Sequence, residues 1–181
     1  VRRWKKQLDA SRSREIDGID ELADRLAATV PSSGDGTIVH GDYRLDNLMF
    51  DRKEPKVLAI LDWELSTLGH PLADFSYHCM SWHIQPGKFR GIAGLDHKAL
   101  GIPTEREYIE AYCRRTGREV DAVMANWDFC IAYNMFRLAA ILQGIMKRAV
   151  DGTASSASAL EQGRRARPLA ELGWEIAQRV R

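Results

Sequence analysis

The sequence predicts an α+β fold that is mostly helical, with one small β region near its middle. Apolar residues recur at three- and four-residue steps before residue 30 and after residue 71, and short apolar runs fall between them. Proline and glycine clusters separate these segments. With 181 residues, 45% of them hydrophobic, the chain can bury a core of its own. We therefore expect N-terminal helices over 1–30, a β region over 37–62 and a helical part over 71–181.

The first half of the chain is expected to pass from helix into short strands. The segment to about Val30 has a helical apolar period, which the proline and glycine residues of 31–36 end. Residues 37–39 and 48–50 are short strand candidates. The run Val57–Leu61 is continuously apolar, which is typical of a strand covered on both faces. The polar residues between the last two strands predict a turn.

The second half has the pattern of several helices. Pro71 suits the first turn of a helix that reaches about Trp82. Residues 81–101 hold four glycines and one proline, which is typical of a loop. Thr104 with Glu107 forms a capping-box pattern that opens another helix.

Three further segments complete the predicted helical part. The capping-box helix is expected to end near Gly117, and Asp121 is expected to cap an apolar helix that continues to about Val150. Residues 152–158 predict a linker, and a last amphipathic helix carries the apolar residues between 160 and 176.

Composition and charge exclude several classes of function. The 26 Lys and Arg nearly balance the 25 Asp and Glu, so the chain lacks the cationic excess with which proteins bind nucleic acid or anionic membranes. Three widely spaced cysteines without a CxxC pattern fit a reducing compartment, and the basic N-terminal residues are not followed by the apolar stretch of a secretory signal. We therefore expect a cytoplasmic protein. The apolar segment 129–146 contains Arg137, which predicts a buried core helix in place of a membrane span.

The candidate chemistry lies in the segment His40-Gly-Asp-Tyr-Arg-Leu-Asp-Asn47 and in Asp62, which follows Asn47 by fifteen residues. Short strands would flank the first segment and a buried strand would end at Asp62, so Asp42, Asn47 and Asp62 could meet at one point. Their oxygens are hard donors suited to Mg²⁺, and no nearby cysteine or pair of histidines suggests zinc or copper. Taken alone, residues 42–47 could equally be a polar turn, and His40 an ordinary polar residue.

The order of these motifs resembles the catalytic loop of the kinase superfamily, in which H-R-D-x-x-x-x-N precedes a metal-binding Asp. Here HGD stands in place of HRD and Asp62-Trp-Glu64 in place of Asp-Phe-Gly, as in the aminoglycoside and choline phosphotransferase-like family. From Ile38 to Tyr77 the sequence most resembles the phosphotransferase domains associated with acyl-CoA dehydrogenases of types ten and eleven. The resemblance implies the C-terminal lobe of a protein-kinase-like fold, in which a small β hairpin region carries the catalytic loop.

The resemblance implies a role for each matching residue. Asp42 would be the catalytic base that accepts the proton of the attacking hydroxyl. Arg44, otherwise an ordinary surface arginine, would neutralise charge near the transferring phosphate. Asn47 and Asp62 would hold Mg²⁺, and His40 would brace the loop from beneath.

Two further acidic residues match the family pattern. Asp74, in the sequence Pro71-Leu-Ala-Asp-Phe, resembles an aspartate that hydrogen-bonds the catalytic-loop backbone, so its expected role is structural support. Glu64 is a candidate contact to a second metal ion, through water.

The resemblance implies a kinase that uses Mg²⁺ and ATP to transfer the γ-phosphoryl group to the hydroxyl of a small molecule, such as a hydroxyacyl-CoA or an aminoglycoside-like acceptor. Only 39 residues precede His40 and their pattern is helical, so we expect the nucleotide-binding N-terminal lobe to be absent, and the nucleotide contacts stay unassigned. A truncated form with little turnover of its own is expected, and the face left by the missing lobe favours a homodimer. The alternatives are a catalytically inactive binding or assembly module and a metal-dependent phosphohydrolase.

Overall fold

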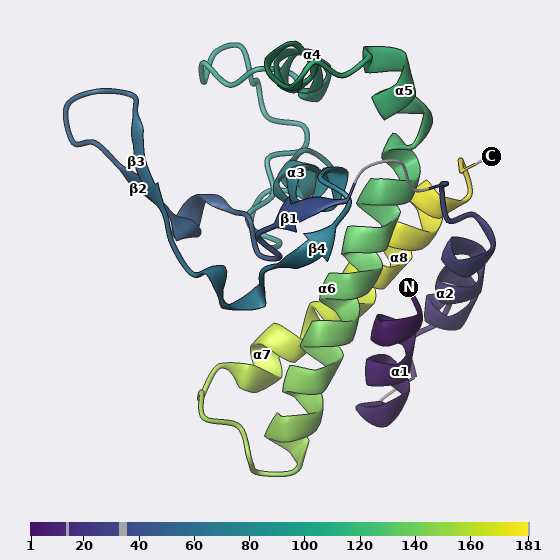
Figure 1. Cartoon of the computed structure of the whole chain (residues 1–181). Coiled ribbons are helices and arrows are strands. Elements are labelled where there is room, and N and C mark those ends of the chain that lie inside the picture. The colour runs from purple at the N-terminus through teal and green to yellow at the C-terminus, as the bar shows by residue number, and fades with distance from the viewer. Residues whose placement is uncertain (14, 33–35, 181) are drawn as a thin grey trace.

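The computed structural model has helices packed around one long central helix, with the β region against one side of them (Figure 1). It describes residues 1–13, 15–32 and 36–180. The α-helices are α1 (Arg2–Ala10), α2 (Ile19–Ala28), α3 (Leu72–Cys79), α4 (Glu105–Thr116), α5 (Val120–Ala125), α6 (Trp127–Val150), α7 (Ala159–Arg164) and α8 (Ala166–Ala177). The strands are β1 (Thr37–Val39), β2 (Leu48–Phe50), β3 (Val57–Ile60) and β4 (Thr67–Gly69). Short 3₁₀ helices are η1 (Leu45–Asn47), η2 (Trp63–Leu65) and η3 (Met80–Trp82). The mostly helical α+β prediction is confirmed, whereas the centre of the predicted break, residues 33–35, lies outside the described residues.

The central helix is α6, which forms the core because it is apolar around most of its circumference. Its residues Ile131, Met135 and Phe136 have no exposed surface, and the helix packs along α8 and also against α1, α3 and α7. By length and composition α6 could cross a membrane, yet 83% of its most apolar stretch is buried inside the structure. The prediction of a buried core helix is therefore confirmed.

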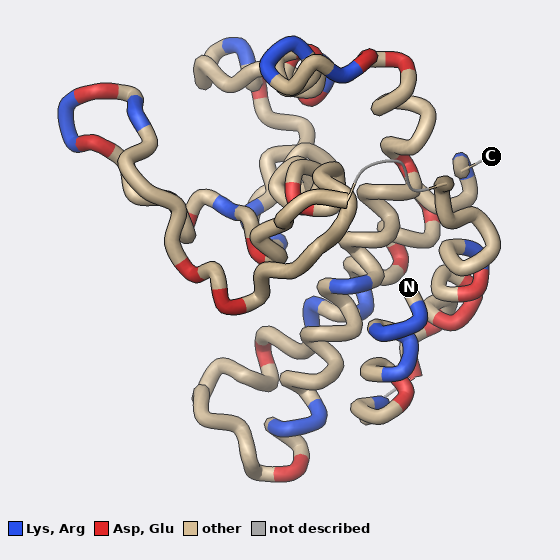
Figure 2. The backbone as a smooth tube through the Cα atoms, in the orientation of Figure 1, with Lys and Arg blue, Asp and Glu red and all other residues tan. Residues whose placement is uncertain are grey.

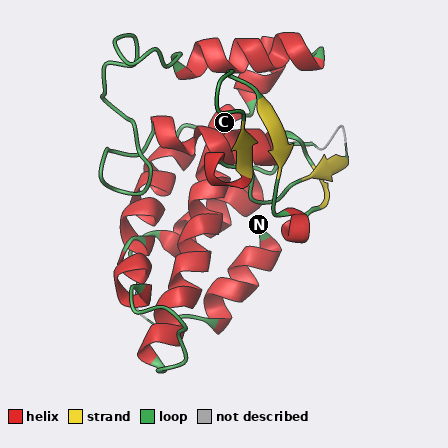
Figure 3. Cartoon of the chain, turned by 90° about the vertical axis from the view of Figure 1, so that its left-hand side faces the viewer, coloured by secondary structure: helices red, strands yellow, loops and turns green. Residues whose placement is uncertain are grey.

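The four strands form two nested antiparallel pairs (Figure 3). The outer pair joins β1 to β4, with Thr37 opposite Gly69, and the inner pair joins β2 to β3, with Leu48 opposite Ile60. Because the inner pair lies between the outer strands in sequence, the segment from β1 to β2 runs beside the segment from β3 to β4. This nesting brings residues 40–47 next to residues 61–66. Strand β4, which contains Thr67, Leu68 and Gly69, was not predicted.

Strand β3 corrects one prediction. It ends at Ile60, and its side chains are not covered on both faces: Val57 is 44% exposed and Leu58 is 52% exposed. The reason is that the β2–β3 hairpin projects away from the helices (Figure 1). Other large apolar side chains of the β region are exposed as well: Ile38, Leu45, Met49, Phe50, Leu61, Trp63, Leu65 and Leu68.

The N-terminal segment is divided, where one continuous helical pattern was predicted. Helix α1 ends at Ala10, and α2 begins only after Gly18, whose φ of 77° lies in the left-handed region that glycine adopts readily. Ile16 lies in the connection between the two helices and is nevertheless buried. It fits the helical spacing of apolar residues because it is part of the core, although it is not part of a helix. The periodic pattern therefore predicted the core residues better than the helix ends.

The predicted C-terminal helices are also divided. Asp121 caps no helix, because it lies inside α5, whose N-cap is Glu119. Asn126 then separates α5 from α6, and Arg165 separates α7 from α8, where a single amphipathic helix was expected. The helix after Pro71 is confirmed, with Pro71 at its N-cap. The loop after it and the linker over 152–158 are likewise free of helix and strand beyond η3.

The capping box of α4 is confirmed. The Thr104 hydroxyl accepts from the Glu107 backbone N–H at 3.3 Å, and the Glu107 carboxylate accepts from the Thr104 N–H at 2.8 Å. Gly117 ends the helix with a φ of 66°, again in the left-handed region. Both signals are local, which is why the sequence alone placed this helix.

Thr104→Ala should lower the free energy of unfolding by about 1 kcal/mol, because the backbone N–H of Glu107 in the first turn loses its side-chain partner. Urea unfolding followed by circular dichroism measures this change. Thr116→Ala is the matched control, since the Thr116 hydroxyl donates only to a carbonyl one turn earlier in the same helix. An equal loss in both variants would mean that the capping box adds nothing.

Cationic and anionic positions alternate along much of the described backbone, while the first turns of α1 carry cationic residues alone (Figure 2). The three cysteines, Cys79, Cys113 and Cys130, are buried free thiols. Burial raises the pKa of Cys130 to about 12, so this thiol stays protonated at neutral pH.

Candidate active site

The loop over residues 40–47 turns sharply at Gly41. Its φ of 85° lies in the left-handed region, and a Cβ on this residue would collide with the carbonyl oxygen of Leu65 in η2. Only glycine therefore allows the loop to pass so close to η2. The close approach fixes the loop against the segment that carries Asp62.

His40 connects this loop to the end of β3. Its ring is only 2% exposed, its Nε2 lies 2.7 Å from the carbonyl oxygen of Leu61, and its Nδ1 accepts from the Asp42 backbone N–H at 3.2 Å. A carbonyl can only accept and an N–H can only donate, so these partners require a neutral imidazole with the proton on Nε2. The Trp63 ring covers it, with ring centroids 4.8 Å apart. His40 thus occupies a structural position beneath the loop and does not face open space.

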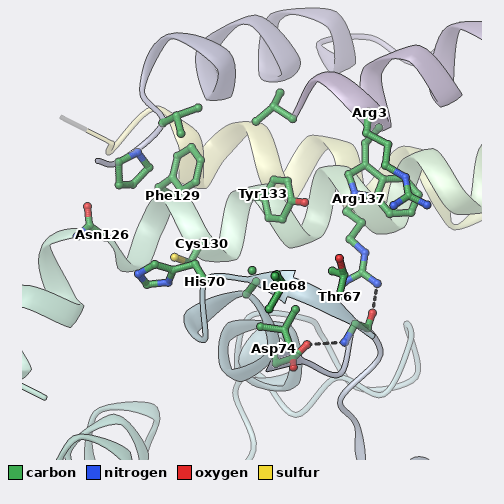
Figure 4. A pocket seen from close by; sticks show the side chains of 18 of the residues that line it. Arg3, Thr67, Leu68, His70, Asp74, Asn126, Phe129, Cys130, Tyr133 and Arg137 are labelled. Atoms are coloured by element: carbon green, nitrogen blue, oxygen red, sulfur yellow. Dashed lines mark hydrogen bonds between the residues drawn. The ribbon is translucent and has the colours of Figure 1, made fainter. Parts of the chain in front are cut away.

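Asp74, in the first turn of α3, holds the loop by its backbone. Its carboxylate accepts from the N–H groups of His40 and Gly41, the latter at 2.9 Å. From the other side Arg137 of α6 donates to the carbonyl oxygen of Gly41. Figure 4 shows the two contacts with Gly41 as dashed lines, one from Asp74 and one from Arg137. The backbone immediately before Asp42 is therefore fixed by two charged side chains from two different helices.

Asp74→Asn should lower the free energy of unfolding by about 1–3 kcal/mol, because the amide NH₂ cannot accept and one of the two N–H donors loses its partner. Urea unfolding gives the value. Asp51→Asn is a control, since Asp51 accepts from two backbone N–H groups, at 2.8 and 3.1 Å, through one oxygen that Asn can keep, in an exposed turn. Equal losses at the two positions would contradict a special role for the buried contact.

Asp42 projects from the loop with its side chain 17% exposed. Its carboxylate lies 3.0 Å from Nε of Arg44 and accepts from Nδ2 of Asn47 at 3.1 Å. The same Asn47 nitrogen donates to the Asp42 carbonyl at 2.9 Å. Because the amide nitrogen of Asn47 is used in this way, its Oδ1 is the atom left to meet a cation. Arg44 lies beside the candidate base, with its side chain 31% exposed, and its role at the phosphate stays a prediction.

Asp62 follows the strand pairing directly. The N–H of Leu61 donates to the carbonyl of Asn47 at 2.8 Å, which places Asp62 one residue beyond a backbone contact to Asn47. Its φ of 66° is unusual for a residue other than glycine, and such conformations concentrate at functional sites. Glu64 lies exposed in η2, two residues further on. The described part of the chain holds no group of three His, Cys, Asp or Glu residues close enough to bind a metal.

The donor set fits a cation that binds few protein ligands. One amide oxygen and one exposed carboxylate, from Asn47 and Asp62, are hard donors of the kind that Mg²⁺ uses together with waters and phosphate oxygens. These two residues would hold it, because the neighbouring His40 already uses its ring nitrogens for the Leu61 carbonyl and the Asp42 N–H. The second-metal role of Glu64 stays a prediction.

Tyr77 and Arg137 belong to the site, although neither was predicted to. Burial, and then the negative charge of Asp42 and a hydrogen bond to it, raise the pKa of Tyr77 to about 12. Tyr77 follows Asp74 by three residues, so both lie on one face of α3, and this spacing was the available signal. Arg137 appeared in the sequence only as a charge within an apolar segment.

A cavity of about 440 Å³ borders the far side of the Arg137 contact (Figure 4). It lies between α1, α6 and β4, with a mainly apolar wall that includes Trp4, Leu68, Phe129 and Tyr133. Gly41, Asp74 and Arg137 form its polar end. The cavity therefore gives solutes a route to the guanidinium of Arg137, which is otherwise buried.

The sequence model of the Phosphotransferase enzyme family matches residues 1–130, which include the whole loop and its neighbours. The chain belongs to this family. Acyl-CoA dehydrogenase family member 10 from Mus musculus is 44% identical over 181 residues, which cover 98% of this chain and 16% of that protein. Acyl-CoA dehydrogenase family member 11 from Homo sapiens is 36% identical over 182 residues, covering 99% and 23%. The resemblance inferred from the motifs is confirmed.

A solved crystal structure from Ralstonia eutropha JMP134, named as a candidate aminoglycoside phosphotransferase, superposes on this phosphotransferase family member with a TM-score of 0.93. The two are 60% identical, and the match covers 99% of this chain and 54% of the other. The chain thus spans about half of that protein and less than a quarter of the two dehydrogenase family members. Its assignment as a C-terminal lobe without a nucleotide-binding lobe stays a prediction.

Proposed function

We propose that this chain carries the catalytic loop and metal-binding residues of an ATP- and Mg²⁺-dependent phosphotransferase that acts on a hydroxyl of a small molecule. The observation that carries the proposal is the network in which Asn47 donates to Asp42 while its backbone pairs with the residue before Asp62. The backbone contact brings Asn47 next to Leu61, the residue before Asp62, and so supports a metal site shared by Asn47 and Asp62. Membership of the phosphotransferase family supports the same reaction type.

Each residue then has a defined task. Asp42 accepts the proton of the attacking hydroxyl, and its contact with Asn47 holds the carboxylate in one orientation. Asn47 and Asp62 would bind Mg²⁺, which when bound offsets the charge of the nucleotide phosphates. Arg44 stabilises negative charge beside Asp42. Because phosphoryl transfer depends on positioning and charge stabilisation, a rigid loop is the main requirement on the protein.

For the acceptor we propose a hydroxyacyl-CoA or related hydroxy acid. The relatives that support this choice are named as acyl-CoA dehydrogenase family members and match nearly the whole of this chain. An aminoglycoside-like acceptor is the competing choice, because the solved relative is named for such compounds. A screen of both acceptor classes separates the two.

Two measurements test this function. Thermal unfolding of the 181-residue chain with MgATP, with ATP alone and with Mg²⁺ alone asks whether the site binds nucleotide in a metal-dependent way. A product screen by mass spectrometry, on the longest product of the gene, then presents hydroxyacyl-CoAs beside aminoglycosides. We expect a phosphorylated product from one acceptor class.

Asp62→Asn should abolish the Mg²⁺-dependent part of the MgATP stabilisation and leave the free protein as stable as the wild type, because Asp62 is exposed. Asp121→Asn, at an exposed position of α5, should keep the full response. Absence of any phosphorylated product with both acceptor classes, from the longest gene product, would refute the proposed function.

A further inference from the structure

Arg137 is an unusual residue for its place in the fold. It lies in the middle of the core helix α6, where its chain neighbours Phe136 and Leu138 are buried, and is itself only 8% exposed. It also lies beyond residues 1–130, so the family match assigns it nothing. A buried cation is costly unless its donors find strong partners, and an apolar residue would fill the same volume at lower cost.

Arg137 contacts the catalytic loop, the helix α3 beside it and the first helix of the chain. Its guanidinium donates to the carbonyl oxygen of Gly41, 96 residues away in the chain. It also lies 5.0 Å from the ring centroid of Tyr77 and 5.4 Å from that of Trp4, so two aromatic faces cover the cation. No ion pair with a carboxylate is found for it within the described ranges. The positive charge of Arg137 is therefore stabilised by the carbonyl oxygen of the loop backbone and by aromatic rings, and not by a carboxylate among the described residues.

These contacts converge on Asp42. Gly41 immediately precedes Asp42, and its N–H and C=O are held by Asp74 and Arg137 respectively. The Tyr77 ring lies 5.0 Å from the guanidinium, and Tyr77 is close enough to Asp42 that the charge of this carboxylate helps to raise the pKa of Tyr77. Arg137 thus limits the movement of Asp42 through the backbone on one side and through a side chain on the other.

We propose that Arg137 is a positioning residue, which reaches from the core helix to fix Gly41 and Tyr77 and thereby sets the orientation of Asp42. The inference rests on the proposed phosphotransferase function for its consequence in catalysis. Its structural half, a catalytic loop held in place by Arg137, stands without that function and can be measured separately.

The first experiment compares the kinetics of variants in the longest product of the gene, with the acceptor found in the screen. Arg137→Ala should lower kcat about 100-fold while the KM for MgATP stays nearly unchanged, because the base is misplaced but the metal donors are not. Arg137→Lys keeps the charge without the planar donors and should recover little. Arg148→Ala, at an exposed position on the same helix, is the control and should match the wild type.

Chemical rescue separates positioning from general damage. Because the cavity reaches Arg137, guanidinium ion should enter the space left in Arg137→Ala and restore kcat in a saturable way, at concentrations far below those that unfold proteins. It should not raise kcat in Tyr77→Phe, which keeps the ring and Arg137 but lacks the hydroxyl that faces Asp42. A loss of kcat in Arg137→Ala that guanidinium does not restore would overturn the positioning role.

The second experiment needs no activity. Amide hydrogen exchange by mass spectrometry, on the 181-residue chain, should show faster exchange of the loop over residues 40–42 in Arg137→Ala than in the wild type or Arg148→Ala, and guanidinium should slow it again. Unchanged exchange in the loop would overturn the inference about Arg137 whether or not the chain is a kinase. Faster exchange in a protein that phosphorylates no acceptor would support the structural half while refuting the proposed function.

Discussion

Asp42→Asn is expected to lower kcat for phosphoryl transfer by about 10²- to 10⁴-fold, which is the usual contribution of a positioned base. The substitution keeps the shape of the side chain and one acceptor for the amide of Asn47, now 3.1 Å away. It removes the group that takes the proton and the negative charge that faces Arg44 at 3.0 Å. The KM for MgATP should change little, because the metal donors are left in place.

The assay is product formation by the longest product of the gene with the acceptor identified in the screen, at saturating MgATP. Asp46→Asn is the matched control: Asp46 lies in the same loop, its side chain is 55% exposed, and it pairs with Arg90 at 2.7 Å. An exposed ion pair contributes little, so this control should keep kcat within about twofold. Full activity in Asp42→Asn would place the base elsewhere and refute the role assigned to the HGD segment.

The parts of the fold that were predicted from the sequence are those that local chemistry determines. The capping box of Thr104 and Glu107 and the turn between β2 and β3 depend on residues a few positions apart. The ends of α1 and α8 were not predicted, because buried residues outside a helix can continue the apolar spacing of that helix. Exposure of β3 was not predicted either, since apolar content does not say whether another element covers a strand.

The candidate site divides in the same way. The order HGD, Asn at plus five, a strand and then Asp62 could be read along the chain, and strand nesting brings these segments side by side. The contact of Asp74 with the loop spans 34 residues, and the resemblance to the family implied it. The contact of Arg137 with Gly41 spans 96 residues, and nothing local distinguishes this arginine from a charge that only interrupts an apolar stretch.

Gly41→Ala is expected to lower the free energy of unfolding by about 4 kcal/mol. A left-handed conformation costs a residue other than glycine about 1–3 kcal/mol, and forcing an atom into packed surroundings costs a similar amount again. Both costs apply here, since φ is 85° and the added Cβ meets the carbonyl oxygen of Leu65. That oxygen is backbone and cannot rotate away as the end of a flexible side chain would.

Relief of this clash would move the loop away from η2 and so loosen the contacts that Asp74 and Arg137 make with Gly41. Urea unfolding measures the stability loss, and Gly36→Ala is the control, because a Cβ there has no atom within 4 Å and its φ is outside the left-handed region. Reduced freedom of the unfolded chain should leave the control unchanged or more stable by up to about 1 kcal/mol. Equal stability of the two variants would show that the loop does not pass η2 as closely as the structure has it. The inference that a rigid loop positions Asp42 would then fail as well.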